Sequence, residues 1–422
     1  MEIKDLYKLY LQCAGLNTDT RTIEKGQLFL ALKGENFDGN AFALQALEAG
    51  AAYAVVNDSV QADDPRLIKV PDTLAALQQL AAWHRQQFDI PVIGLTGTNG
   101  KTTTKEMIRT VLGVKYRVTA TEGNLNNDIG VPLSVLKINA DTQIAIIEMG
   151  ASHPDDLKPL LAVAQPTHGL ITNVGKAHLL GFGSFEGVKH AKGLLYDWLK
   201  EHEGVAFANA DDLELQGMLW ERGLGCIPYG LMGVSVLPTS AEEPFLRLQW
   251  ADGSVLATHL VGAYNAFNVL AALKLAWFFQ VPEADAREAI ASYVPSNNRS
   301  QLLKTEKNTV IVDAYNANPS SMAVALDNLA LASGRKVALL GDMRELGADS
   351  AAEHKKVVER LRGVEAYLVG EEFGKASAGT GIRCFDSSDE LAAWLKENPL
   401  QGCTVLVKGS RGTRMEKVIP SL

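Results

Sequence analysis

Cysteine is scarce in this 422-residue chain, and its positions exclude two common uses of the residue. The four cysteines, Cys13, Cys226, Cys384 and Cys403, are widely spaced and form no Cys-x-x-Cys pair. That spacing provides neither a disulfide framework nor a zinc-binding motif. We expect all four to be small apolar core residues or surface thiols.

Long hydrophobic runs and basic clusters are also missing. The most apolar helical stretch, residues 269–279, is interrupted by Lys274 and is too short to span a bilayer. The first ten residues carry charges throughout and lack the apolar stretch of a signal peptide. We therefore expect a cytoplasmic protein without membrane insertion. The net charge of −9, with no local Lys/Arg cluster, argues against a nucleic-acid partner.

The sequence contains no internal repeat, no low-complexity segment and no Gly-x-Gly-x-x-Gly after a predicted strand. A nicotinamide site is therefore unsupported. Hydrophobic residues at 47% and charged residues at 21% are typical of a globular protein. The length predicts two to four domains, with enough residues for a substantial core.

The most informative segment present is residues 93–105, Ile-Gly-Leu-Thr-Gly-Thr-Asn-Gly-Lys-Thr-Thr-Thr-Lys. It joins a predicted buried strand at residues 91–95 to a predicted helix at residues 103–112. A helix N-terminus favours an anion, and Gly97 and Gly100 allow close approach of the backbone. Lys101 would reach the terminal phosphates and the Thr102 hydroxyl would bind Mg²⁺. The segment predicts binding of ATP or a close relative.

The glycine spacing is shorter than in a standard P-loop, because the first glycine of that motif would fall on Leu95. What remains is the core Gly97-Thr-Asn-Gly-Lys-Thr102. The alternative is a Gly-rich strand-to-helix turn that binds nothing.

The hydrophobic pattern predicts an α/β fold of three domains, at residues 1–80, 81–295 and 296–422. The first is a small α/β unit with strands at 28–32 and 52–56 around a helix at 41–49, followed by a connecting helix at 73–87. The middle domain is a P-loop-type ATPase with a mostly parallel sheet. Its predicted elements are strands at 143–147, 169–174 and 205–208, an antiparallel annex within 228–258 and a helix at 265–279. The third is Rossmann-like, with strands at 310–312, 337–340, 367–369 and 405–407.

Polar residues follow the predicted strands of the middle domain. Glu148 ends one strand, and Gly175-Lys-Ala-His178 follows another. Ligands of a parallel sheet bind beyond the carboxyl ends of its strands, so Lys101, Glu148 and His178 are expected to converge on one crevice. The alternatives are an ordinary strand-end carboxylate for Glu148 and a structural hydrogen bonder for His178.

Several motifs together resemble the Mur ligase superfamily, which makes amide bonds through acyl phosphates. They are Thr96–Thr102, Glu148-Met-Gly150, Asn173-Val-Gly175, Ala177-His178, Ala191-Lys192, Asn209-Ala-Asp211 and Asn265-x-x-Asn268. Further strings resemble those ligases of the superfamily that join D-alanyl-D-alanine to UDP-MurNAc-tripeptide. These strings are Thr18–Arg21, Leu28–Gly34, Asp38-Gly39, Gly123–Asn127, Asp313–Ser320, Leu340–Gly347 and Lys408–Arg411. The resemblance covers essentially the whole chain.

The resemblance implies ATP and Mg²⁺ as cofactors, the two peptide substrates as partners, and a monomer. The first domain would bind UDP-MurNAc-peptide, the second ATP, and the third would close on ATP and the amine substrate. The implied ATP-site residues are Gly97, Thr98, Asn99, Gly100, Lys101, Thr102, Thr103, Asn265, Asn268, Arg299, Asp313 and Tyr315. The implied metal ligands are Thr102, Glu148, His178 and Lys192 as a carbamate.

Lys101, Glu148, His178, Lys192 and Arg299 are the implied catalytic residues. The implied substrate-binding residues are Asp19, Thr20, Arg21, Lys33, Gly34, Asp38, Gly39, Asn124, Asn126 and Asn127. For these substrate residues, simple turn positions are the alternative.

Structural roles are alternatives for several other residues. Lys192 could be a solvated helix lysine, Asn265 and Asn268 could be polar residues at a helix start, and Asn316 and Asn318 could form a capping turn.

Two rival functions remain. One is another ligase of the superfamily, such as a folylpolyglutamate synthase or a neighbouring muramyl ligase, although residues 124–127 and 313–319 argue against it. The other is a catalytically silent nucleotide-binding homologue, which ADP formation would exclude.

Overall fold

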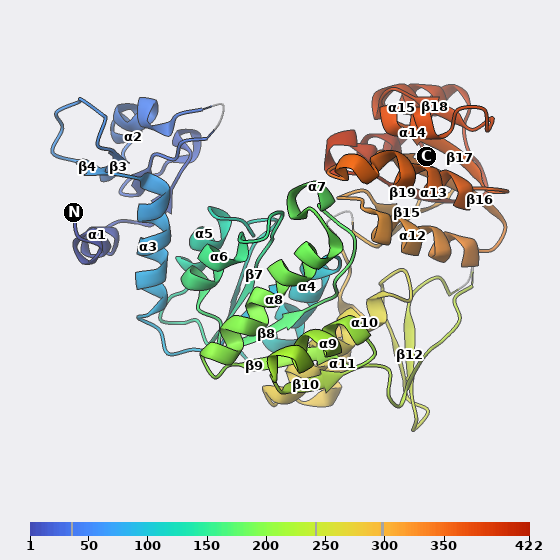
Figure 1. Ribbon diagram of the computed structural model, residues 1–422, viewed down its shortest axis with the longest axis horizontal. Coiled ribbons are helices and arrows are strands. Elements are labelled where there is room, and N and C mark those ends of the chain that lie inside the picture. The colour runs from blue at the N-terminus through green and yellow to red at the C-terminus, as the bar shows by residue number, and fades with distance from the viewer. Residues whose placement is uncertain (35–36, 241–242, 297–298) are drawn as a thin grey trace. The chain divides into compact units, whose positions relative to one another are not determined.

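The computed structural model describes residues 1–34, 37–240, 243–296 and 299–422 (Figure 1). The chain divides into two compact units. The first comprises residues 1–94, 119–149 and 157–167, and the second comprises residues 95–118, 150–156 and 168–422. All four cysteines are free thiols, and Cys403 is buried. None of the helices in the described ranges is both long enough and apolar enough to cross a membrane.

The first unit contains a four-stranded parallel sheet in the order β1-β2-β3-β4. Its strands are Leu16–Asn17, Leu28–Leu30, Tyr53–Asn57 and Leu67–Val70, and helices α1 (Ile3–Tyr10), α2 (Ala43–Glu48) and α3 (Thr73–Arg85) accompany them. Phe29 of β2 and Ala54 and Val56 of β3 pack with Ala46 and Leu47 of α2, which fixes that helix on the sheet.

Further elements of the first unit come from later in the chain. They are β6 (Val118–Ala120), α5 (Gly130–Val135), β7 (Ile144–Glu148) and α6 (Leu157–Ala164). Helix α3 packs against α5 and α6, and these three helices lie together in Figure 1. All five residues of β7 are buried, so this strand is a core strand that carries Glu148 at its end.

Strand β5 (Val92–Thr96) runs from the first unit into the second and belongs to a six-stranded sheet ordered β10-β9-β8-β5-β7-β6. In the second unit, β8 (His168–Ile171), β9 (Val205–Asn209) and β10 (Cys226–Tyr229) are parallel neighbours. The helices here are α4 (Lys101–Gly113), α7 (Leu179–Phe182), α8 (Phe185–Glu201), α9 (Leu213–Arg222), α10 (Asn265–Phe278) and α11 (Glu283–Ser292).

The antiparallel annex is smaller than predicted. Strands β11 (Val234–Val236), β12 (Arg247–Trp250) and β13 (Val255–Ala257) form a three-stranded antiparallel sheet. The prediction that this annex includes Pro228 is wrong, because Pro228 pairs with Ala208 in the parallel ladder of β10 and β9. Strand β10 is an edge strand, where the missing N–H of proline is tolerated.

The C-terminal residues form a second six-stranded sheet, ordered β14-β15-β19-β16-β17-β18. Its strands are Gln301–Lys304, Thr309–Asp313, Arg335–Gly341, Glu365–Val369, Arg383–Phe385 and Cys403–Lys408, numbered β14 to β19 in chain order. Only β14 is antiparallel to its neighbour. This arrangement confirms the predicted Rossmann-like sheet and adds β14 and β18 to it.

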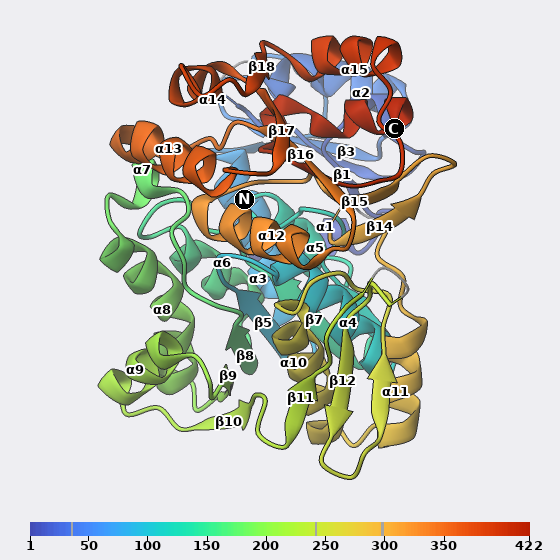
Figure 2. The same ribbon diagram turned by 90° about the vertical axis from the view of Figure 1, so that its right-hand side faces the viewer.

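Alternating side chains of this sheet pack on opposite faces. Ala338 and Leu340 pack with helices α12 (Pro319–Leu331), α13 (Ser350–Arg360) and α14 (Glu371–Ala376). Val337 and Leu339 pack with α15 (Ser388–Glu397) and the C-terminal 3₁₀ helix η5 (Met415–Ser421). Figure 2 shows α12 and α15 on the two sides of the sheet. Helix cover on both faces leaves the carboxyl ends of the strands as the place for a ligand.

The buried Arg85 at the end of α3 holds together the turns around it in the first unit. Its guanidinium donates to the carbonyl oxygens of Ala164 (3.2 Å), Phe88 (2.6 Å) and Ile90 (3.3 Å). Replacing Arg85 with Met removes these donors and leaves the carbonyls without them, so we expect the free energy of unfolding to fall by ~3 kcal/mol. Urea unfolding followed by circular dichroism measures this change.

Arg66→Met is the matched control, since Arg66 is half-exposed and pairs only locally with Asp64 at 2.7 Å. A surface change of this kind should stay within about 0.5 kcal/mol of wild type. Equal unfolding curves for the two variants would contradict a structural role for Arg85.

Candidate active site

The predicted phosphate loop connects β5 to α4 in a conformation that needs glycine at two positions. Gly97 has φ 146° and Gly100 has φ 79°, both in the region that favours glycine. A Cβ on Gly97 would lie 2.0 Å from Thr172 Oγ1, and one on Gly100 would lie 2.8 Å from Asn268 Oδ1. Glycine at these two positions therefore lets the loop pack closely against Thr172 and Asn268.

The end of β8 anchors this loop. The carbonyl oxygen of Asn99 accepts from Thr172 Oγ1 (2.6 Å) and from Asn173 Nδ2 (3.0 Å). In return, Asn99 N–H donates to Asn173 Oδ1 (3.0 Å), and Thr98 Oγ1 accepts from Gly175 N–H (2.9 Å). The loop is thus held in one conformation before any ligand binds.

Lys101 begins α4 and folds back over the loop. Its Nζ donates to the carbonyl oxygens of Gly97 (2.9 Å) and Thr98 (3.2 Å). Thr102 and Thr103 lie in the same first helical turn and are both buried. An ammonium group held over a turn at a helix N-terminus makes this loop attractive to a polyphosphate.

Asn265 and Asn268 of α10 are buried, and their amide groups form a chain of hydrogen bonds. Thr104 Oγ1 donates to Asn268 Oδ1 (3.0 Å), Asn268 Nδ2 donates to Asn265 Oδ1 (2.9 Å), and Asn265 Nδ2 donates to Val261 O (2.8 Å). This chain ties α10 to α4. Contact of the two residues with adenine stays a prediction.

Lys192 of α8 is buried, with 2% of its surface exposed. Burial, and secondly the charge of Lys101, hold the pKa of its amine well below the usual range. The alternative of a solvated helix lysine is therefore wrong. A neutral amine is the form that can react with carbon dioxide to give a carbamate.

His178 follows β8 in a left-handed conformation, with φ 51°, and its Nδ1 contacts the carboxylate of Glu345. This hydrogen bond to His178 lowers the pKa of Glu345. Glu345 was not predicted as a site residue, although it lies within the motif at residues 340–347. The pairing partners lie far apart in the sequence, so no local pattern could have revealed the contact.

The loop after β15 also reaches the phosphate loop. Asn318 Nδ2 donates to Asn99 Oδ1 (2.8 Å), while Asn318 Oδ1 accepts from Ser321 N–H (2.8 Å) and caps α12. Asn318 therefore forms the capping turn considered for it and also contacts the phosphate loop.

Charged residues at the carboxyl end of the C-terminal sheet are held in place by buried partners. Asp313 forms an ion pair with Lys408, whose side chain is 1% exposed. The guanidinium of Arg299 stacks on the ring of Tyr315 at 3.7 Å, and Arg411 lies 5.3 Å from the same ring. Arg299 Nε is buried and makes no hydrogen bond with the described residues, so it has donor capacity left for a ligand.

Within the first unit, Glu148 and Asn126 lie together. Asn126 Nδ2 donates to Glu148 Oε1 (2.8 Å), and Glu148 N–H donates to Thr121 Oγ1 (3.0 Å). Asn127 Oδ1 accepts from Gly130 N–H (2.8 Å), and Asn126 N–H donates to Asn124 O (2.8 Å). These bonds fix the segment 124–127 as a rigid turn beside the carboxylate.

The predicted substrate residues of the first sheet lie in short turns. Asp19 accepts from the backbone and guanidinium of Arg21, which lowers the pKa of Asp19 to about 2, and Thr20 begins the 3₁₀ helix that Asp19 caps. Asp38 caps the turn at Gly39 and forms an antiparallel bridge with Lys33, and Gly34 N–H donates to Phe37 O (2.9 Å). Turn geometry thus accounts for these residues, and substrate contact stays a prediction.

The described residues contain no group of three or more His, Cys, Asp or Glu side chains arranged to hold a metal ion. The predicted ligand set consists instead of a hydroxyl, a carboxylate, an imidazole and a modified lysine. The two oxygen donors, Thr102 and Glu148, are of the kind that Mg²⁺ prefers.

Three family models match this chain. The Mur ligase middle domain matches residues 95–276, the glutamate ligase domain of Mur ligases matches residues 298–411, and the catalytic domain of the Mur ligase family matches residues 12–85.

Curated relatives match over nearly the full length. The UDP-N-acetylmuramoyl-tripeptide–D-alanyl-D-alanine ligase of Bacillus subtilis is 36% identical, with 97% of this chain and 93% of the relative covered. The ligase of the same name from Escherichia coli is 37% identical, with 96% and 93% covered.

Solved structures agree with these matches. MurF from Acinetobacter baumannii superposes with a TM-score of 0.87 at 30% identity, covering 100% of this chain and 98% of that chain. MurF ligase from Thermotoga maritima in complex with ADP gives a TM-score of 0.85 at 27% identity, with 98% and 97% covered. The three-domain α/β fold predicted from the sequence is thereby confirmed, and the chain belongs to the Mur ligase family as a ligase of the MurF type.

Proposed function

We propose that this protein is the ATP-dependent ligase that adds D-alanyl-D-alanine to UDP-MurNAc-tripeptide in peptidoglycan precursor synthesis. The reaction yields UDP-MurNAc-pentapeptide, ADP and phosphate. The observation that carries this proposal is the anchored loop Gly97–Thr102 with Lys101 above it, in a chain that matches MurF ligases over nearly its full length. We infer that it acts in the cytoplasm as a monomer.

The chemistry follows in two steps. The tripeptide carboxylate attacks the γ-phosphorus of ATP, ADP leaves, and an acyl phosphate forms. The amine of D-alanyl-D-alanine then attacks the acyl carbon, the bond from that carbon to the phosphate oxygen breaks, and phosphate leaves. The first step brings two negative groups together, and the second develops negative charge on the oxygen of a tetrahedral intermediate, so fixed positive charge at Lys101 and Arg299 lowers both barriers.

The residues fit Mg²⁺ as the bound cation. Thr102 and Glu148 would hold one ion, His178 would be a ligand or orienting group for a second, and a carbamate on Lys192 would add a further oxygen donor. When bound, Mg²⁺ neutralises phosphate charge. Support for Lys192 comes from its burial and lowered pKa, which favour the neutral form of its amine. Asn126, bonded to Glu148, would orient that carboxylate.

The remaining predicted residues keep their proposed roles. Asn265, Asn268, Asp313 and Tyr315 would complete the ATP site. Asp19, Thr20, Arg21, Lys33, Gly34, Asp38 and Gly39 would bind the UDP-MurNAc part, and Asn124, Asn126 and Asn127 would bind nearer the reacting end. The domain at residues 1–80 would bind UDP-MurNAc-peptide, and the domain at 81–295 would bind ATP. The domain at 296–422 would close on ATP and the amine substrate.

Phosphate release from ATP and Mg²⁺ with UDP-MurNAc-tripeptide tests the function directly. We expect release that depends on D-alanyl-D-alanine, with the pentapeptide nucleotide detected by mass spectrometry. Lys101→Met should lower kcat by about 100- to 1000-fold, because the phosphates lose a fixed charge. Lys115→Met is the control, since the Lys115 ammonium donates to the carbonyl oxygens of Phe279 (3.4 Å) and Gln280 (2.8 Å) at the end of α10, outside the phosphate loop.

Release that requires another amine, such as an L-amino acid, would replace the substrate assignment by that of a different ligase in the family. Absence of release with every amine would support a silent homologue.

Gly97→Ala tests whether the loop itself carries the activity. The added Cβ would overlap Thr172 Oγ1, so the loop must move, and we expect kcat/KM for ATP to fall at least about 100-fold. Gly113→Ala, at the end of the helix α4 that follows the loop, is the control, because nothing lies within 4 Å of its added Cβ. Helix propensity makes that variant equally stable or more stable. Full activity of Gly97→Ala would contradict the assignment.

A further inference from the structure

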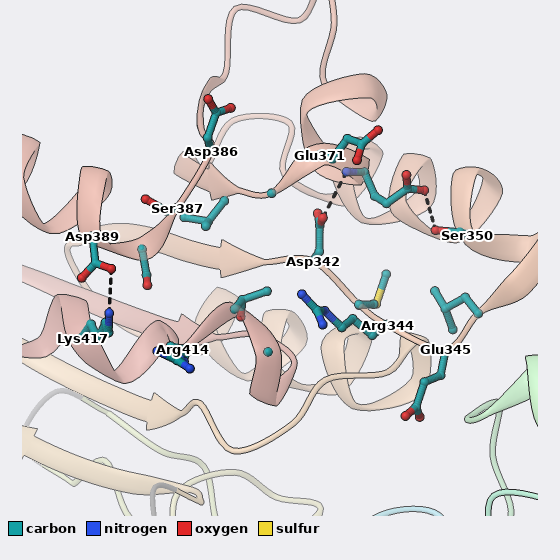
Figure 3. Close-up of a pocket in the computed structure, with 18 of the residues that line it drawn as sticks. Asp342, Arg344, Glu345, Ser350, Glu371, Asp386, Ser387, Asp389, Arg414 and Lys417 are labelled. Carbon is teal, nitrogen blue, oxygen red and sulfur yellow. Dashed lines mark hydrogen bonds and ion pairs between the residues drawn. The ribbon is translucent and has the colours of Figure 1, made fainter. Parts of the chain in front are cut away.

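Two cavities of the second unit meet at the carboxyl end of the C-terminal sheet. The larger, of about 940 Å³, lies at the ends of β16, β17 and β18 and is shown in Figure 3. The smaller, of about 250 Å³, is lined by Ala177, His178 and the segments 316–318, 344–345 and 410–412. Arg344, Glu345 and Gly412 line both, so they form the boundary between the two cavities.

Most charged groups around these cavities already have partners. Glu345 pairs with His178, and Asp342 accepts from the N–H groups of Glu372 (3.1 Å) and Phe373 (2.8 Å). Asp389 pairs with Lys417 at 2.6 Å, as Figure 3 shows. The charged groups of these residues are therefore already paired within the walls of the cavities.

Arg344 and Arg411 are different, because both are exposed and neither guanidinium has a carboxylate partner among the described residues. Arg344 points into the cavity in Figure 3. Its guanidinium rests on the backbone of Gly412, where a Cβ would lie 2.5 Å from Cζ. The backbone N–H of Arg344 donates to Ser410 Oγ at 2.9 Å. The ring of Tyr315 supports Arg411.

The position of the small cavity favours a carboxylate over the phosphates of ATP as the anion for these two residues. One of its walls carries His178, but the residues that line it include none of the phosphate loop 97–103. D-Alanyl-D-alanine carries the required anion, because its amine reacts and its carboxylate does not. Two extended residues span about 7 Å, so the carboxylate of the dipeptide lies about 7 Å from its reacting amine.

We propose that Arg344 and Arg411 bind the carboxylate of D-alanyl-D-alanine in the small cavity. They would thereby select, as the acceptor, a dipeptide whose C-terminal carboxylate is free. A guanidinium fork binds carboxylate oxygens in pairs, which gives both affinity and orientation. The amine then lies at the His178 side of the cavity. This inference rests on the proposed function and assigns residues to its second substrate.

The test compares D-alanyl-D-alanine with D-alanyl-D-alaninamide, which has the same shape without the carboxylate charge. With saturating ATP and UDP-MurNAc-tripeptide, wild type should prefer the acid in kcat/KM by about 10- to 100-fold. In Arg344→Met and Arg411→Met, KM for the dipeptide should rise and this preference should fall toward unity. KM for ATP should stay unchanged.

Arg414→Met is the control, because Arg414 lines only the larger cavity and should keep the wild-type preference. Unchanged thermal unfolding of each variant shows that the fold is retained, and Arg→Lys variants should recover part of the preference. A wild-type preference in both Met variants would overturn the inference. A rise in KM for ATP with an unchanged preference for the acid over the amide would also overturn the inference. That result would assign the two arginines to phosphate binding. Failure of wild type to release phosphate would count against the proposed function instead.

Discussion

The active site depends on hydrogen bonds between the Gly97–Thr102 loop and the end of β8. Thr172 and Asn173 bind both the carbonyl oxygen and the N–H of Asn99, so the backbone of the loop is satisfied inside the protein. Buried backbone groups without such partners would favour a different loop conformation. With them satisfied, the N–H groups at the start of α4 and the ammonium of Lys101 are already positioned for a phosphate, and little reorganisation is needed when it binds.

The same loop is where the C-terminal sheet joins the site within the second unit. Asn318 connects Asn99 to the start of α12, and Glu345 connects the loop after β16 to His178. Both contacts come from loops at the carboxyl ends of parallel strands, where the fold directs its ligand-binding residues. A shift of the Asn318 loop would therefore act on the phosphate loop, and a shift of the Glu345 loop would act on His178.

Local patterns in the sequence were sufficient where one segment forms one structure. The phosphate loop, the buried strands β5 and β7 and the helix α10 follow from glycine placement and apolar periodicity. The edge strands β14 and β18 were missed because they are short and only partly buried, and β10 was misassigned because Pro228 is typical of a turn. The pairing of Glu345 with His178 and the cavity beside Arg344 depend on tertiary folding, which periodicity does not contain. Burial of Lys192 is also a tertiary property.

The proposed reaction depends on activation of the tripeptide carboxylate as an acyl phosphate in this site. Its most direct test uses UDP-MurNAc-tripeptide labelled with ¹⁸O in the reacting carboxylate, with mass analysis of the phosphate released in the presence of D-alanyl-D-alanine. We expect each phosphate to carry one ¹⁸O atom, because the carboxylate oxygen bonds to phosphorus and leaves with it. Phosphate without ¹⁸O would show that water, and not the carboxylate, takes the phosphoryl group, and would rule out an acyl phosphate.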